Sequence, residues 1–106
     1  MAKTAQDCRT MGDIRAEIDR IDRALMALFA ERWGYIGRAA EIKGPQGLKA
    51  DIPERVEEVV ANAGRNAAAA GLEPEFYQAI WRQLIQHSID HEKAILGEDG
   101  GAAHEP

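Results

Sequence analysis

The chain has 106 residues, of which 45% are hydrophobic and 29% are charged, so its composition is that of one ordinary globular domain rather than of a disordered chain. Its formal net charge of −5 argues against nucleic acid as a partner, because a general nucleic-acid surface needs a basic excess. No apolar run approaches the ~20 residues that cross a bilayer. The single cysteine, Cys8, cannot form an internal disulfide. We therefore expect a cytoplasmic protein that has no membrane partner.

The first predicted element is a long helix. The run Thr10-Met11-Gly12-Asp13 resembles a capping box, and Asp13 is a second candidate for the cap itself. The helix is expected to extend from about Asp13 to Lys43, because no adequate stop signal interrupts this range. The run Gly44-Pro45-Gln46-Gly47 is predicted to end it.

Two shorter helices follow, and no strand is predicted, so the expected class is all-α with three helices. A loop over residues 44–52 leads to the second helix, which begins at Pro53 with Asp51 or Ile52 near its cap and ends at Gly71. The third helix begins at Glu73-Pro74. The expected organisation is a flexible arm (1–9), a single helical domain (10–96) and a disordered tail (97–106).

One face of the first helix carries an apolar stripe that two cations interrupt. Its members recur almost every three or four residues, the period of a helix face turned toward a core or a partner helix. A lone buried charge is very costly, and no acidic residue shares the stripe, so the simplest partner for the cations is an anionic ligand bound among helices. The stripe consists of Ile14, Ile18, Ile21, Leu25, Leu28, Arg32, Ile36, Ala39 and Lys43.

The length of this helix predicts a dimer. About 31 residues make a rod of roughly 46 Å, whereas a compact domain of this size has a radius of gyration near ~13 Å. A single chain would therefore leave much of the apolar stripe in water. Two chains that lay these helices side by side would bury it, so we expect an intertwined homodimer.

The position of Arg15 fits a site shared between two chains. Arg15 precedes Arg32 by seventeen residues, which turns it about 100° away from the face of Arg32 and Lys43. It therefore should not join them within one chain. In an antiparallel dimer it would reach the site of the partner chain.

The other helices add polar groups to the same predicted site. Ser88 and Glu92 form an i,i+4 pair that interrupts the apolar stripe of the third helix. Glu54 opens the second helix, next to the loop that follows Lys43. Three cations, a hydroxyl and two carboxyl groups suit a small, compact dianion as the bound molecule.

A metal site is not expected. His87 and His91 are also spaced i,i+4, with Asp90 between them, which is a spacing compatible with metal ligation. No third ligand stands at a suitable spacing, and the pair lies off the face of Ser88 and Glu92. We predict neither a metal nor a cofactor.

Several segments together resemble the all-helical chorismate mutase family over about residues 7–96. They are the run from Asp13 to Asp22 (DIRAEIDRID), Ala30-Glu31-Arg32, Ile42-Lys43 and Ile52-Pro53-Glu54-Arg55-Val56. The Asp7-Cys8 opening and the short loop resemble a branch that includes isochorismate pyruvate lyases of salicylate biosynthesis. The resemblance implies a dimer of three-helix chains with two sites, each of which takes an arginine from the first helix of the other chain.

The resemblance also implies a role for each site residue. Arg32 and the partner's Arg15 would pair with the two substrate carboxylates, which bidentate guanidinium groups bind well. Lys43 would bind the ether oxygen of the breaking bond, and Glu92 would lie on the other side of that oxygen. Glu54 would accept a hydrogen bond from the ring hydroxyl. Ser88 would lie beside a carboxylate, and the apolar wall would come from Ala39, Ile85 and Ile89.

The implied reaction is the concerted sigmatropic rearrangement of chorismate to prephenate, which requires no nucleophile, metal or redox cofactor. The protein would hold the enolpyruvyl arm over the ring and stabilise negative charge on the ether oxygen. Elimination of isochorismate to salicylate and pyruvate breaks the same ether bond and remains an alternative, as does an aminodeoxychorismate substrate. A further alternative is a non-catalytic helical dimer that senses a small dianion.

Two positions depart from the family pattern. The family often has glutamine where Glu92 stands, and an ionised glutamate would repel the developing oxyanion. Our hypothesis is that Glu92 works in its protonated form, as a hydrogen-bond donor. The second departure is Pro53, where other branches often carry an additional arginine near the site.

Overall fold

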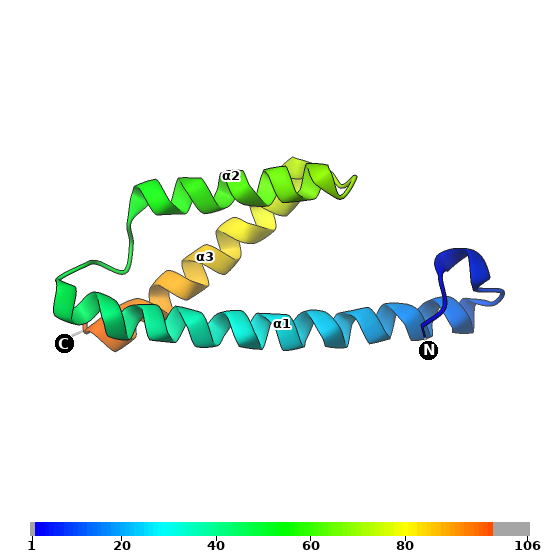
Figure 1. Cartoon of the computed structure of the whole chain (residues 1–106), viewed down its shortest axis with the longest axis horizontal. Helices are drawn as coiled ribbons and strands as arrows, with labels where there is room; N and C mark the ends of the chain where they lie inside the picture. The colour runs from blue at the N-terminus through cyan, green and yellow to red at the C-terminus, as the bar shows by residue number, and fades with distance from the viewer. Residues whose placement is uncertain (1, 99–106) are drawn as a thin grey trace, which may run out of the picture. The chain divides into compact units, whose positions relative to one another are not determined.

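The computed structural model describes residues 2–98 of the chain, and within them it is all-helical, with no strand. The elements are the 3-10 helix η1 (Ala5–Asp7) and the α-helices α1 (Met11–Gln46), α2 (Pro53–Ala69) and α3 (Pro74–Leu96) (Figure 1). The predicted class, all-α with three helices, is confirmed. None of the helices in this range is long and apolar enough to cross a membrane.

The start of α1 is fixed by a reciprocal capping box. The Asp13 backbone N–H donates to Thr10 Oγ1 at 3.0 Å, and the Thr10 backbone N–H donates back to Asp13 Oδ2 at 3.3 Å. The Arg9 backbone N–H also donates to this carboxylate, and together with Lys3 it holds the pKa of Asp13 below its usual value. Thr10 is therefore the cap, and the alternative that Asp13 caps the helix is wrong.

The end of α1 lies further along the chain than the sequence predicts. The helix continues through Gly44 and Pro45 to Gln46, because a proline in the last turn removes one backbone donor without preventing the turn from closing. Gly47, with φ +71°, ends the helix, and the Leu48 backbone N–H donates to the Lys43 carbonyl at 3.0 Å. The prediction that the helix ends at Lys43 is wrong by about one turn.

The chain forms two compact units, one up to Gly34 and one from Tyr35 onward. In the first unit, none of the side chains from residue 2 to residue 34 is buried. Ile18 is 51% exposed and Leu28 is 61% exposed, although both belong to the predicted apolar stripe. The first half of that stripe is thus an uncovered apolar face in the single chain.

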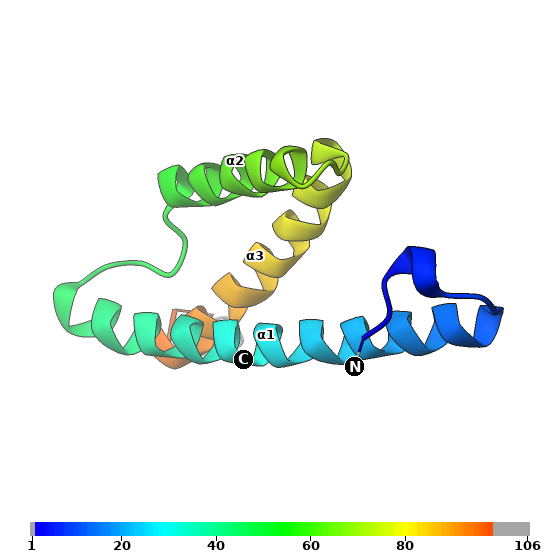
Figure 2. The same ribbon diagram turned by 45° about the vertical axis from the view of Figure 1, so that its right-hand side comes forward.

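The second unit has a small core between α2 and α3, which a tight turn connects (Figure 2). As predicted, α2 begins at Pro53 with Ile52 as its cap, and Gly71, with φ +77°, closes the turn at its end. A Cβ added at Gly64 would come within 3 Å of the amide end of the Gln78 side chain, which would then have to shift. The core cluster consists of Ala50, Val60, Ile85 and Ile89, with Val56, Val59 and Leu96 packed against it.

The last two described residues form the C-terminal cap of α3. Gly97 has φ +73° and caps the helix, and the Glu98 backbone N–H donates to the Lys93 carbonyl at 2.8 Å. Gly97 and Glu98 are the first two residues of the segment predicted as a disordered tail. The rest of that predicted tail lies outside the described residues. In the predicted N-terminal arm, residues 5–7 form the single turn of η1.

Candidate active site

A charged pair joins the end of α1 to the end of α3. Lys43 Nζ lies 2.8 Å from Glu92 Oε1 and also donates to the Ala50 carbonyl at 3.2 Å. The Lys43 side chain is only 19% exposed and that of Glu92 only 7% exposed. The structure thus brings together two predicted site residues that lie far apart in the sequence.

This pair corrects one step of the sequence argument. The apolar stripe of α1 contains no acidic residue, and for this reason its cations are expected to need an anionic ligand. Lys43 instead finds a carboxylate on another helix, so its charge is compensated before any ligand binds. Breaking such a buried pair by removing one partner typically costs about 3–5 kcal/mol. The apolar periodicity of α1 does not predict this partner, because Glu92 lies on α3.

One face of α3 carries most of the remaining predicted residues. Counted over the whole residue, Ser88 and Glu92 are each 5% exposed. Within residues 2–98 they are the two buried polar residues. Ile85 and Ile89 are buried on the same face, as their spacing predicts. The wall residue expected from α1, Ala39, is half-buried, and its neighbour Ala40 is fully buried.

The other three predicted residues are more exposed. Glu54 lies in the first turn of α2 and its side chain is exposed. Arg15 and Arg32 belong to the unit that ends at Gly34, where Arg15 is exposed and Arg32 is half-buried. A single chain therefore joins Lys43 to Glu92, but it does not by itself bury Arg15 or Glu54.

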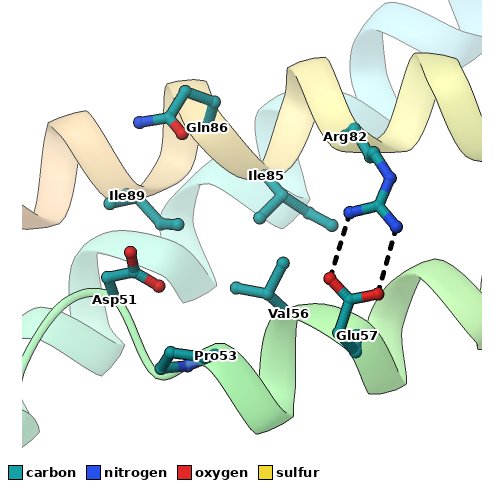
Figure 3. Close-up of a pocket in the computed structure, with 8 residues that line it drawn as sticks. All are labelled: Asp51, Pro53, Val56, Glu57, Arg82, Ile85, Gln86 and Ile89. Atoms are coloured by element: carbon teal, nitrogen blue, oxygen red, sulfur yellow. Dashed lines mark hydrogen bonds and ion pairs between the residues drawn. The ribbon is translucent and has the colours of Figure 1, made fainter.

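A groove of about 300 Å³ opens beside this face of α3, between α3 and the start of α2 (Figure 3). At one end Arg82 Nη1 and Nη2 donate to the two oxygens of Glu57 at 3.1 and 3.0 Å. These hydrogen bonds hold the pKa of the Glu57 carboxyl below its usual value. No feature of the sequence predicts this pair. The groove is lined by Asp51, Pro53, Val56, Glu57, Arg82, Ile85, Gln86 and Ile89.

The described residues contain no group of three or more histidine, cysteine, aspartate or glutamate side chains that would hold a metal ion. His87 is exposed on α3, and His91 is half-buried one turn later. The groups that the structure brings together at the site are the charged pair of Lys43 and Glu92 and the buried Ser88, beside the apolar side chains of Ile85 and Ile89. Such an arrangement binds and orients an anion and stabilises charge that develops on an oxygen atom.

Comparison of the sequence with known proteins places the chain in a family. The family model described as chorismate mutase type II matches residues 14–93. The isochorismate pyruvate lyase of Pseudomonas aeruginosa is 31% identical over 101 residues, which are 95% of this chain and 99% of the lyase. The T-protein of Enterobacter agglomerans is 30% identical over 74% of this chain but only 21% of its own length.

A third relative, the chorismate mutase of Methanocaldococcus jannaschii, is 28% identical over 83% of this chain and 89% of its own length. The family match covers all of α2, nearly all of α1 and α3, and every predicted site residue from Arg15 to Glu92. The chain therefore belongs to the chorismate mutase type II family.

Proposed function

We propose that this protein is a chorismate mutase that rearranges chorismate to prephenate. The observation that carries the proposal is the family match over residues 14–93, which includes all of the predicted cations and carboxyl groups. The buried ion pair of Lys43 and Glu92 supports it, because it places a cation and a carboxyl group within one hydrogen bond of each other. An ether oxygen bound between these two groups would accept from the Lys43 ammonium on one side and, on the other, from the Glu92 carboxyl in its protonated form.

The proposed catalysis rests on orientation and charge. Arg32 and the partner's Arg15 hold the two carboxylates of the substrate, which fixes the enolpyruvyl arm over the ring. Lys43 donates to the ether oxygen as negative charge develops there. Glu54 accepts a hydrogen bond from the ring hydroxyl, Ser88 lies beside a carboxylate, and Ala39, Ile85 and Ile89 form the apolar wall.

We further propose that the working form is a homodimer in which each chain donates Arg15 to the other chain's site. The uncovered apolar face of α1 up to Gly34 supports this proposal, since Ile18 and Leu28 remain half or more exposed in the single chain. The exposed Arg15 lies on the same half of the helix. A second copy that covers the apolar face would bring the arginines of each chain toward its partner.

A second candidate function is the elimination of isochorismate to salicylate and pyruvate. It is favoured by the lyase of Pseudomonas aeruginosa, whose alignment covers 95% of this chain and 99% of that relative. The two reactions break the same ether bond, so the same charged groups would serve both. They differ in whether the enolpyruvyl arm forms a new bond to the ring or leaves as pyruvate.

The two activities are distinguished by separate assays of the purified chain. Chorismate and isochorismate are supplied in turn, and prephenate, salicylate and pyruvate are measured. The proposal predicts prephenate from chorismate at a higher kcat/KM than that for salicylate from isochorismate. The reverse order would make the lyase the main activity. A chain inactive on both would instead favour a dimer that only senses a dianion.

Replacing Glu92 by glutamine tests the donor role of this residue. In the chain without substrate, Glu92 accepts from Lys43, and we propose that it becomes a protonated donor when the ether oxygen lies between them. A glutamine amide donates at every pH, so Glu92→Gln is expected to retain activity at alkaline pH where the unmodified chain loses it. The measurement is kcat/KM for chorismate from acid to alkaline pH. A flat profile for the unmodified chain would contradict this role.

A further inference from the structure

We propose that Glu98, which follows the C-terminal cap of α3, is a positioning residue that holds Lys43 in place through the backbone of Ala50. This inference rests on the proposed function for its effect on the rate. Its structural part, a tether between α3 and the loop that joins α1 to α2, is measurable without any substrate. The expected disordered tail included Glu98, so no role for it was predicted from the sequence.

The tether consists of two hydrogen bonds to one buried residue. The Ala50 backbone N–H donates to Glu98 Oε2 at 3.1 Å, and the Ala50 carbonyl accepts from Lys43 Nζ at 3.2 Å. Ala50 is only 4% exposed, so each of these backbone groups needs a partner within the protein. The side chains of Glu98 and Lys43 supply those partners. A shift of Ala50 on loss of the Glu98 bond would therefore also move the carbonyl that holds Lys43.

The geometry at the end of α3 explains how Glu98 reaches the loop. Gly97 adopts a left-handed conformation, with φ 73° and ψ 26°, and its N–H bonds to the Lys93 carbonyl. The Glu98 backbone N–H bonds to the same carbonyl at 2.8 Å, which fixes the turn that Glu98 occupies. A Cβ added at Gly44 would lie 3.4 Å from Leu96 Cδ2, so this end of α3 lies beside the end of α1 in the same unit.

The consequence concerns two residues of the proposed site. Lys43 has Glu92 and the Ala50 carbonyl as its acceptors, so when Glu92 turns to the substrate, the carbonyl remains as the fixed acceptor for the ammonium group. Ala50 also lies shortly before Pro53, where α2 begins, so the tether constrains the start of the helix that carries Glu54. Hydrogen bonds of this kind keep the side chains that contact the substrate in the geometry that the reaction needs.

The test compares Glu98→Ala with Glu98→Gln and uses Glu58→Ala as the control. Glutamine keeps an acceptor oxygen for the Ala50 N–H, whereas alanine removes it. Glu58 is an exposed residue of α2 that pairs only locally, with Arg55, and it lies outside the proposed site. For each variant the amide exchange rate of Ala50 is measured by NMR, together with the melting temperature and with kcat and KM for chorismate.

Glu98→Ala is expected to accelerate exchange at Ala50 and to lower kcat by roughly 10- to 100-fold, since small displacements of catalytic groups have effects of this order. In Glu98→Gln, the exchange rate at Ala50 and kcat should both be close to those of the unmodified chain. The melting temperature of Glu98→Ala should change no more than that of Glu58→Ala. The proposal is overturned if Ala50 exchanges equally fast in Glu98→Ala and in the unmodified chain, if kcat is unchanged, or if glutamine behaves like alanine. An unmodified chain inactive on both substrates would contradict the proposed function, while exchange at Ala50 would still decide whether Glu98 is the tether.

Discussion

Replacing Lys43 by alanine is expected to lower kcat for chorismate by about 100- to 1000-fold, the effect of removing one donor from a site where negative charge develops on oxygen. Lys43 is the predicted donor to the ether oxygen, and in the structure its ammonium group is already held by Glu92 and by the Ala50 carbonyl. The variant therefore loses both the charge and its fixed position. KM should change less than kcat, because the charge on the oxygen develops mainly in the transition state.

Loss of stability must be separated from loss of catalysis in this variant. Lys43→Ala leaves Glu92 buried without its cation, which costs about 3–5 kcal/mol in comparable pairs. The double variant Lys43→Ala with Glu92→Gln removes the unpaired charge, so its free energy of unfolding should recover while its kcat stays low. Urea denaturation and steady-state kinetics measure the two quantities. Lys49→Ala, at an exposed position of the loop, is the matched control. Recovery of kcat in the double variant would contradict the role of Lys43.

Replacing Arg15 by alanine is expected to reduce kcat/KM by roughly 30- to 5000-fold, since truncating one partner of a buried charge pair costs about 2–5 kcal/mol. In the single chain Arg15 is exposed, so its loss should leave the stability of the chain within about 0.5 kcal/mol of its original value. The kcat/KM of Arg15→Lys should fall between that of Arg15→Ala and that of the unmodified chain, because lysine keeps the charge but not the bidentate contact with a carboxylate. Steady-state kinetics over a range of chorismate concentrations measure these effects.

The matched control for this prediction is Arg23→Ala, which removes another exposed arginine of α1 without touching the proposed site. It should leave kcat/KM unchanged. An Arg15→Ala variant with the same kcat/KM as Arg23→Ala would show that Arg15 is an ordinary surface residue.

Local signals in the sequence predicted most of the fold. The capping box at Thr10, the proline at the start of α2 and the apolar periodicity of α3 each depend on residues within a few positions of one another. Local signals also predict an end of α1 that is about one turn too early. The run Gly44-Pro45-Gln46-Gly47 does end α1, but only at its last residue, because Pro45 in the last turn removes just one backbone donor and Gly47 is the residue that leaves the helical conformation.

The site was harder to predict because its contacts join distant segments. The spacing of Ser88 and Glu92 predicted a polar break in a buried face, and both are buried. The pairing of Lys43 with Glu92, the pair of Glu57 with Arg82 and the bond from Ala50 to Glu98 each link separate helices or a helix and a loop. Such contacts follow from tertiary packing, and the periodicity of one helix carries no information about them.

The central claim is that each site is completed by Arg15 of the partner chain, and mixing two defective variants tests it most directly. Arg15→Ala and Lys43→Ala are combined in equal amounts, unfolded and refolded together, and assayed for prephenate. In a mixed dimer, the Arg15→Ala chain keeps its own Lys43 and receives an intact Arg15 from its partner. Half of the dimers would then hold one intact site of two, so about a quarter of the unmodified activity should return. Activity that stays at the level of the two separate variants would contradict the account.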